Sequence, residues 1–165
     1  MPSRAPAIQA GPSDSVLFRF FFLHVTSVDS IADNLKAFGK SDSAARSKFA
    51  RDAKLTEVEA ALLKDVAGRC NSGLEAHTRN ELAPAVQNLR AQNPTALRAA
   101  DLPAAAAEQL KELDRQHENI VMDHVQELKS AMGPERFQKL YEYVRGTEAP
   151  RIKQAPIPLP QARQK

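Results

Sequence analysis

Residues 16–25 read VLFRFFFLHV and hold four of the chain's seven phenylalanines. Arg19 interrupts this apolar run, and polar Thr26, Ser27 and Asp29 follow it closely. A membrane span needs roughly 20 apolar residues, and a secretory signal needs a basic start, an apolar run and a small-residue cleavage site. The stretch fits neither class, so we interpret it as one apolar face of a buried helix.

At about 100° per residue, one side of a helix over residues 14–38 gathers apolar side chains. We expect this side to be buried, and it consists of Leu17, Phe20, Phe21, His24, Val28, Ile31, Ala32 and Leu35. Phe22 and Leu23 fall toward the polar side, where the next short helix or a partner chain would have to cover them. Asp14 or Ser15 is expected to cap the start of this helix.

The rest of the chain also reads as helices, because helix-favouring residues are abundant and alternating strand patterns are weak. Thr56 and Glu59 form a capping-box pattern that opens a long helix, which is expected to reach Gln92 with a kink or restart near Pro84. Further helices are expected at 44–53, 103–132 and 134–146. The predicted fold is therefore an all-α antiparallel bundle of about four long helices and one short helix.

The chain divides into one helical domain and two polar ends that contain prolines. We expect a disordered arm over 1–13, the bundle domain over 14–146, and a disordered, basic, proline-rich tail over 147–165. Four of the 23 basic residues lie in that tail, so the predicted domain is nearly neutral. Without a basic stripe on the domain, we expect no nucleic acid partner. We also expect no membrane span and no signal peptide in this chain, and an omitted upstream signal would make the protein an exported one.

All four histidines and the single cysteine fall on predicted apolar helix faces. Imidazole commonly binds transition metals and haem iron, and helical bundles build such sites from facing helices. His117 and His124 are seven residues apart, about 10.5 Å along one helix, so they cannot bind one ion together. A site would need His24, His77 and either His117 or His124. The alternative is that each imidazole is a half-buried core residue bonded to a carbonyl or a carboxylate, and that Cys70 is a buried, inert thiol.

Three phrases together resemble a group of bacterial all-helical proteins that are often exported. They are LFRFFFLHV, KLTEVEAALLKDVA and LKELDRQHENIVMDHVQELKSAMGPERFQKLYEYVR. The resemblance covers about residues 16–145 and implies the helical fold, but it implies no activity and no site residues. A weaker resemblance links LTEVE, with Glu59 where the motif has Gln, to periplasmic helical proteins with LTxxQ motifs. Those proteins include chaperones and heavy-metal-resistance factors.

Enzyme signatures are missing from the chain: it has no phosphate-binding glycine loop, no GxSxG elbow and no HExxH pair. We therefore expect a non-enzymatic protein without a cofactor, which works through protein–protein contact, as a structural component or by self-association. One alternative is a transition-metal or haem binding or sensing protein with a histidine-lined site between helices. Another is a periplasmic stress chaperone.

Overall fold

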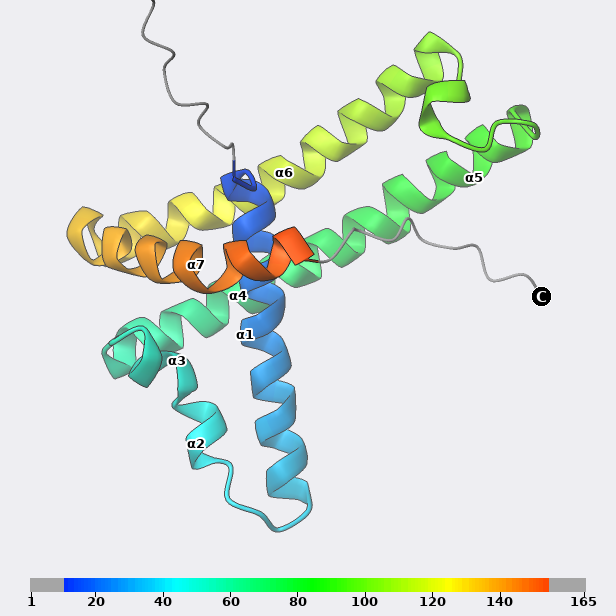
Figure 1. Cartoon of the computed structure of the whole chain (residues 1–165). Coiled ribbons are helices and arrows are strands. Elements are labelled where there is room, and N and C mark those ends of the chain that lie inside the picture. Colours follow the sequence, from blue (N-terminus) through cyan, green and yellow to red (C-terminus); the bar gives the residue numbers. More distant parts are fainter. Residues whose placement is uncertain (1–10, 155–165) are drawn as a thin grey trace, which may run out of the picture.

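The computed structural model describes residues 11–154 and consists of helices joined by short connections (Figure 1). Its four long helices are α1 (Asp14–Ala37), α4 (Glu57–His77), α6 (Ala104–Met132) and α7 (Pro134–Gln154). The shorter elements are α2 (Ser43–Arg46), α3 (Lys48–Asp52), the π-helical turn η1 (Thr78–Leu82), α5 (Ala83–Gln92) and the 3₁₀ turn η2 (Ala99–Asp101). The described part of the chain contains no strand, so the all-α prediction is confirmed.

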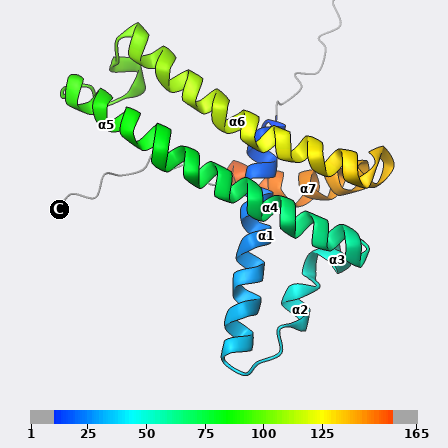
Figure 2. The same cartoon turned by 180° about the vertical axis from the view of Figure 1, so that it is seen from behind.

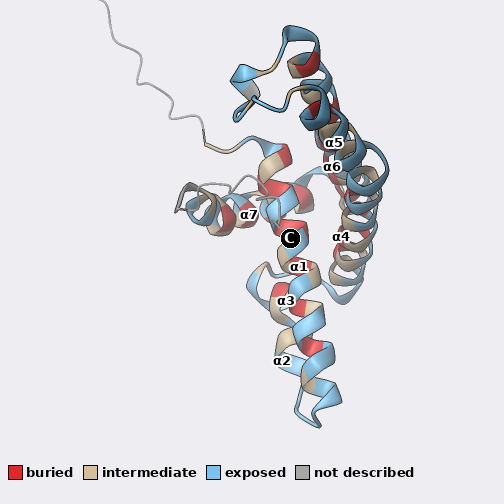
Figure 3. Ribbon diagram, turned by 90° about the vertical axis from the view of Figure 1, so that its right-hand side faces the viewer, coloured by how far each residue is buried: buried red, intermediate tan, exposed pale blue. Residues whose placement is uncertain are grey.

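The helices are arranged around α1. Helices α4 and α5, joined through η1, form one long rod that lies antiparallel beside α6 (Figures 1 and 2). Helix α7 turns back from α6 and passes α1 on the other side, so that α1 lies between α7 and the α4–α6 pair (Figure 3). Helix α1 thus crosses its neighbours instead of running parallel to them as in a regular bundle.

The phenylalanines of α1 form the centre of the core. Phe18, Phe21 and Phe22 are fully buried. Phe18 stacks on Phe137 of α7 with ring centroids 5.9 Å apart, and Phe21 meets the edge of Phe49 of α3 at 5.5 Å. The interpretation of VLFRFFFLHV as the apolar face of a core helix is therefore confirmed. By length and mean hydropathy alone, α1 could also cross a membrane.

The buried face of α1 is rotated relative to the predicted one. Phe22 was expected near the polar side and is fully buried, whereas Phe20 and Ile31 were expected inside and are exposed. The reason is that neighbours cover α1 from two sides, which widens and shifts the buried arc beyond a single helical stripe. A row of apolar side chains on α1 is left uncovered as a result.

Most observed helix ends lie within one or two residues of the ends predicted from local sequence signals. The Thr56–Glu59 capping box at the start of α4 is confirmed. Ser13 caps α1, in place of the expected Asp14 or Ser15. The single short helix predicted at 44–53 is divided at Ser47 into α2 and α3. The cap of α1 is therefore displaced by one or two positions from the predicted one.

The predicted kink near Pro84 takes the form of the π-helical turn η1, which directly precedes α5. Proline has no N–H to donate to the carbonyl four residues earlier, and a wider turn accommodates that missing bond. The rod therefore continues to Gln92 as predicted, but with one irregular turn after His77.

Helix α7 was expected to end at Gly146, and this prediction is wrong, because the helix continues through Pro150 to Gln154. Buried Glu148 bonds to α1, and Ala149 and Ile152 pack against the core. These contacts outweigh the helix-breaking tendency of the glycine and the proline. The remaining part of the predicted tail, and residues 1–10 of the predicted arm, lie outside the described residues.

Candidate functional site

The four histidines lie at three separate places, and all of their side chains are buried or half-buried. Residues 11–154 contain no group of three or more His, Cys, Asp or Glu side chains that could hold a metal ion. The site imagined from the sequence, with His24, His77 and either His117 or His124 around one ion, is therefore not assembled. Only His77 and His117 contact one another.

His24 is a half-buried core histidine that bonds to a carboxylate, as the alternative interpretation of the histidines expected. Its Nδ1 lies 2.8 Å from Oε1 of Glu148, and its ring meets the edge of Phe49 with centroids 5.2 Å apart. Glu148 is itself buried, so this pair fixes the C-terminal half of α7 against α1. His24 thus has a structural role in holding two helices together.

His124 and Cys70 are also explained locally. His124 donates from Nδ1 to the backbone oxygen of Ile120, 2.7 Å away in the preceding turn of α6. Cys70 is fully buried in α4, and burial raises the pKa of its thiol to about 11. A thiol with this pKa stays protonated at neutral pH, as expected for a small core residue.

His77 and His117 form a pair across α4 and α6. Their Nδ1 atoms are 2.6 Å apart, and their ring centroids are 4.6 Å apart. Each ring has a polar neighbour at its other nitrogen. Nε2 of His77 lies 2.9 Å from Oε1 of Gln116, and Nε2 of His117 lies 3.2 Å from Oγ1 of Thr78.

The hydrogen bonds around this pair run in one direction. Gln116 donates from Nε2 to a carboxylate oxygen of Glu112 at 3.4 Å, which leaves its oxygen facing His77. His77 must then donate from Nε2, so its Nδ1 accepts a hydrogen bond from the N–H at Nδ1 of His117. His117 in turn accepts from the hydroxyl of Thr78. A chain of neutral groups thus leads from Thr78 to Glu112.

Two local features bring the pair together. A methyl group on Gly73 of α4 would lie 3.4 Å from Ile120 of α6, so the two helices approach closely one turn away from the histidines. His77 is the last residue of α4, and the π-helical turn begins at Thr78. This change of helical register lets the adjacent residues His77 and Thr78 both contact His117.

Electrostatics favour the neutral form of His117. Burial, followed by the neighbouring His77 and then Arg19, lowers the pKa of His117, and Asp114 acts in the opposite direction. His117 is therefore neutral at neutral pH, in agreement with the hydrogen-bond directions described above. The sequence analysis placed both histidines on inward faces, but it missed Thr78 and Gln116, whose adjacency to the two histidines was the available signal.

A second candidate site is the uncovered row of side chains on α1, which we call the α1 stripe. It consists of Val16, Phe20, Leu23, Ser27, Ile31, Asn34 and Phe38. Of these, Val16 is half-buried and the others are exposed, Phe38 to 80%. Successive members are separated by 4, 3, 4, 4, 3 and 4 residues. This spacing keeps them on one side of a straight helix.

The α1 stripe runs along the whole of α1, including the C-terminal half that projects beyond the core. The C-terminal half of α1 extends away from α6 and α7, and α2 lies beside it (Figure 1). The sequence analysis anticipated that Leu23 would need a cover, either from the short helices or from a partner chain. The short helices pack on another side of α1, so Leu23 stays exposed.

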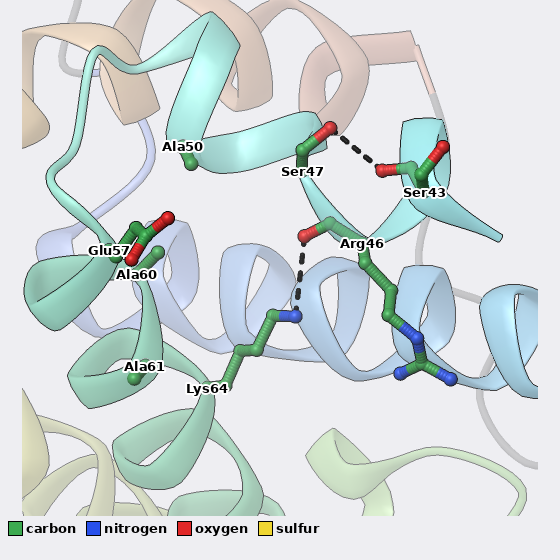
Figure 4. Close-up of a pocket in the computed structure, with 8 residues that line it drawn as sticks. All are labelled: Ser43, Arg46, Ser47, Ala50, Glu57, Ala60, Ala61 and Lys64. Atoms are coloured by element: carbon green, nitrogen blue, oxygen red, sulfur yellow. Dashed lines mark hydrogen bonds between the residues drawn. The ribbon is translucent and has the colours of Figure 1, made fainter.

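A hollow of about 420 Å³ lies between the α2–α3 segment and the first turns of α4, and it opens widely to solvent (Figure 4). Its two basic side chains are already engaged. Arg46 pairs with Asp33 and Asp42, and Lys64 pairs with Asp29 and donates to a backbone oxygen. Glu57 also lines the hollow and has no ion-pair partner among the described residues, so the hollow offers no free positive charge to a ligand, and it is a weaker candidate than the other two sites.

No family model, no curated protein and no solved structure matches this chain. The resemblances described from the sequence therefore remain predictions, and function has to be argued from the residues themselves.

Proposed function

We propose that this is a non-enzymatic helical protein that works by self-association, and that the α1 stripe is the surface through which two copies meet. The observation that supports this proposal is the row of exposed apolar side chains on α1. Monomeric proteins rarely gather several large exposed apolar side chains on one face of a helix, whereas single exposed ones are common.

The polar features of α1 suit a buried contact. Asp29 and Asp33 project away from the stripe in helical phase and are paired with Lys64 and Arg46, whereas the exposed Arg19 lies at the edge of the stripe, one turn before Leu23. Ser27, at the middle of the stripe, donates its hydroxyl to the backbone oxygen of Leu23 at 2.8 Å. Burying Ser27 would therefore leave no donor without a partner.

The order of side chains favours a second copy of the chain as the occupant. The members of the stripe lie symmetrically about Ser27. In an antiparallel pair centred on Ser27, Leu23 of each copy faces Ile31 of the other. Val16 likewise faces Phe38, and the small serine permits close approach at the centre. Such a contact is self-complementary and closes with two-fold symmetry.

The apolar area is large enough to matter. With about 200 Å² for a phenylalanine, the exposed parts of Phe20 (37%) and Phe38 (80%) amount to roughly 230 Å² per chain. At about 25 cal/mol per Å², burying them in both copies contributes about 11 kcal/mol before costs. Association costs about 4–15 kcal/mol, so Leu23 and Ile31 would supply the surplus.

The test is the oligomeric state of the full chain by light scattering and sedimentation equilibrium. We expect a dimer for the wild type. For Leu23→Glu we expect a dissociation constant at least about a hundredfold larger, because dimerisation would remove the carboxylate from water at an apolar contact. Val58→Glu is the matched control, since Val58 is an exposed apolar residue of α4 outside the stripe. This control is expected to dimerise like the wild type.

Cross-linking tests the antiparallel register. A cysteine introduced by Ser27→Cys would meet its own copy at the symmetry axis and form a covalent dimer on mild oxidation, whereas Asn34→Cys would not. Cys70 does not interfere because it is buried. A strictly monomeric wild type, or equal cross-linking of both variants, would refute the proposal. Monomers that sediment with anionic lipid vesicles, but not after Leu23→Glu, would assign the stripe to a membrane surface instead.

A further inference from the structure

The pair of histidines between α4 and α6 lies outside the α1 stripe and takes no part in the proposed dimerisation. The two Nδ1 atoms point at each other at 2.6 Å, with one proton between them. Two imidazole nitrogens that face one another across a single gap can both bind a borderline metal ion once the proton between them has moved elsewhere. We propose that His77 and His117 together bind one divalent first-row transition-metal ion, such as Zn²⁺, Co²⁺, Ni²⁺ or Cu²⁺, between their Nδ1 atoms.

The outer nitrogens already have the partners that metal-bound histidines need. A ligating histidine donates its other N–H to an oxygen, which fixes the orientation of its ring. Nε2 of His77 faces the amide oxygen of Gln116, and Nε2 of His117 faces the hydroxyl of Thr78. A hydroxyl can accept as well as donate, so both rings can carry their proton on Nε2 at the same time.

Metal binding at neutral rings therefore releases no proton. In the metal-free pair, His117 carries its proton on Nδ1, as the direction of the hydrogen bonds requires. On binding, that proton moves to Nε2 of the same ring, and the hydroxyl of Thr78 turns from donor to acceptor. Both Nδ1 lone pairs are then free to bind the ion, and each imidazole remains neutral.

The distances require a small opening of the pair. Zn–N bonds of about 2.0–2.1 Å at a tetrahedral angle place the two nitrogens about 3.3 Å apart, so the present gap must widen by roughly 0.7 Å. His77 can provide this movement, because it is half-buried and lies where α4 gives way to the π-helical turn. Such π turns occur frequently at functional sites.

The site would be open on one side. No third His, Cys, Asp or Glu ligand joins the pair within residues 11–154, so water fills the remaining positions of the ion. Structural zinc sites have four protein ligands, whereas sites that exchange ligands keep open positions. We therefore infer an exchangeable site of modest affinity. The site lies on α4 and α6 and does not involve the α1 stripe.

The experiment measures binding of Zn²⁺ and Co²⁺ to the full chain without a polyhistidine tag, at a pH where imidazole is neutral. Equilibrium dialysis should give one Zn²⁺ per chain, and His77→Ala should weaken binding at least tenfold. His124→Ala is the matched control, since His124 lies on α6 seven residues beyond His117 and outside the pair, and it should bind like the wild type. Because His117 is buried and its replacement would also disturb the core, His77→Ala carries the test.

Nitrogen NMR of histidine-labelled protein gives a readout that general surface binding would not move. With Zn²⁺, the ¹⁵N shifts of both His77 and His117 should report a metal-bound Nδ1 and a protonated Nε2, with His24 and His124 unchanged. If His77→Ala binds Zn²⁺ as tightly as the wild type, the proposal is wrong. The same conclusion follows if the wild type binds none, or if the two rings keep their metal-free shifts. The binding result does not depend on the oligomeric state.

Discussion

Replacing Glu59 tests how the start of α4 is tied to α7. Glu59 accepts the backbone N–H of Thr56 at 3.0 Å and donates its own N–H to Oγ1 of Thr56 at 3.1 Å. Arg136 of α7 binds both carboxylate oxygens of Glu59, at 2.6 and 2.9 Å, and also reaches the backbone oxygen of Lys54 at 2.9 Å. Lys54 has a φ of 54°, so this arginine also holds a strained turn in place.

The magnitude follows from the charge state of Glu59. The hydrogen bonds from Arg136, and then the N–H of Thr56, lower the pKa of Glu59 from 4.5 to about 2. A shift of this size corresponds to at most about 3 kcal/mol of folding stability at neutral pH. Arg136 is partly exposed, and solvent screening reduces this value. We therefore expect Glu59→Gln, which keeps the capping box, to cost about 1–2 kcal/mol, and Glu59→Ala to cost about 1 kcal/mol more.

The assay is urea unfolding followed by far-UV circular dichroism over a range of pH. The folded-state pKa of Glu59 lies below the unfolded value, so its contribution is fully present above pH 4.5 and is lost as the pH falls toward about 2. The difference in unfolding free energy between wild type and Glu59→Gln should therefore shrink over this interval. A difference that is the same at neutral pH and near pH 2, or no difference at all, would refute the reasoning.

Two further predictions concern the core. Phe18→Ala removes a fully buried ring that stacks on Phe137, so the free energy of unfolding measured in urea should fall by about 3–5 kcal/mol. Leu97→Ala, at a highly exposed position, should change this free energy by less than about 0.5 kcal/mol. Equal losses for the two variants would contradict the packing described. Cys70 should not react with Ellman's reagent in the folded protein at mildly alkaline pH, because the thiol is buried and burial raises its pKa to about 11. In denaturant it should react fully. Rapid reaction of the native chain would mean that this part of α4 opens readily.

The helices could be predicted from the sequence because their signals are local. Thr56 and Glu59 act within one turn to start α4. Gly133 adopts a φ of 83° between α6 and α7, a conformation that glycine adopts without strain, and Pro134 begins the next helix. Such signals depend on a few neighbouring residues, so they can be read without knowledge of the fold.

The faces of α1 and the end of α7 could not be predicted, because they depend on contacts between distant segments. Phe22 and Ile31 exchange their expected environments once α1 is enclosed from two sides. The contact of Glu148 with His24, 124 residues away in sequence, extends α7 past a glycine and a proline that normally end helices. A helical wheel contains no information about either contact.

The sequence also indicated that the histidines point inward, but not which of them meet. His77 and His117 become neighbours through the relative shift of α4 and α6, which the close approach of Gly73 to Ile120 and the π-helical turn determine together. Spacing along one helix correctly excluded His117 with His124 as a pair. Pairing across helices depends on this shift, which appears only in the folded chain.

The enclosure of α1 has a consequence for biosynthesis. Phe18 is covered by Phe137 and Tyr141, which are translated about 120 residues later. At about 5–20 residues per second, the aromatic face of the first helix waits roughly 6–24 s on the ribosome before its cover is made. During that interval the phenylalanines of the nascent chain lack their cover from α7, so aggregation competes with folding until α7 has emerged from the exit tunnel.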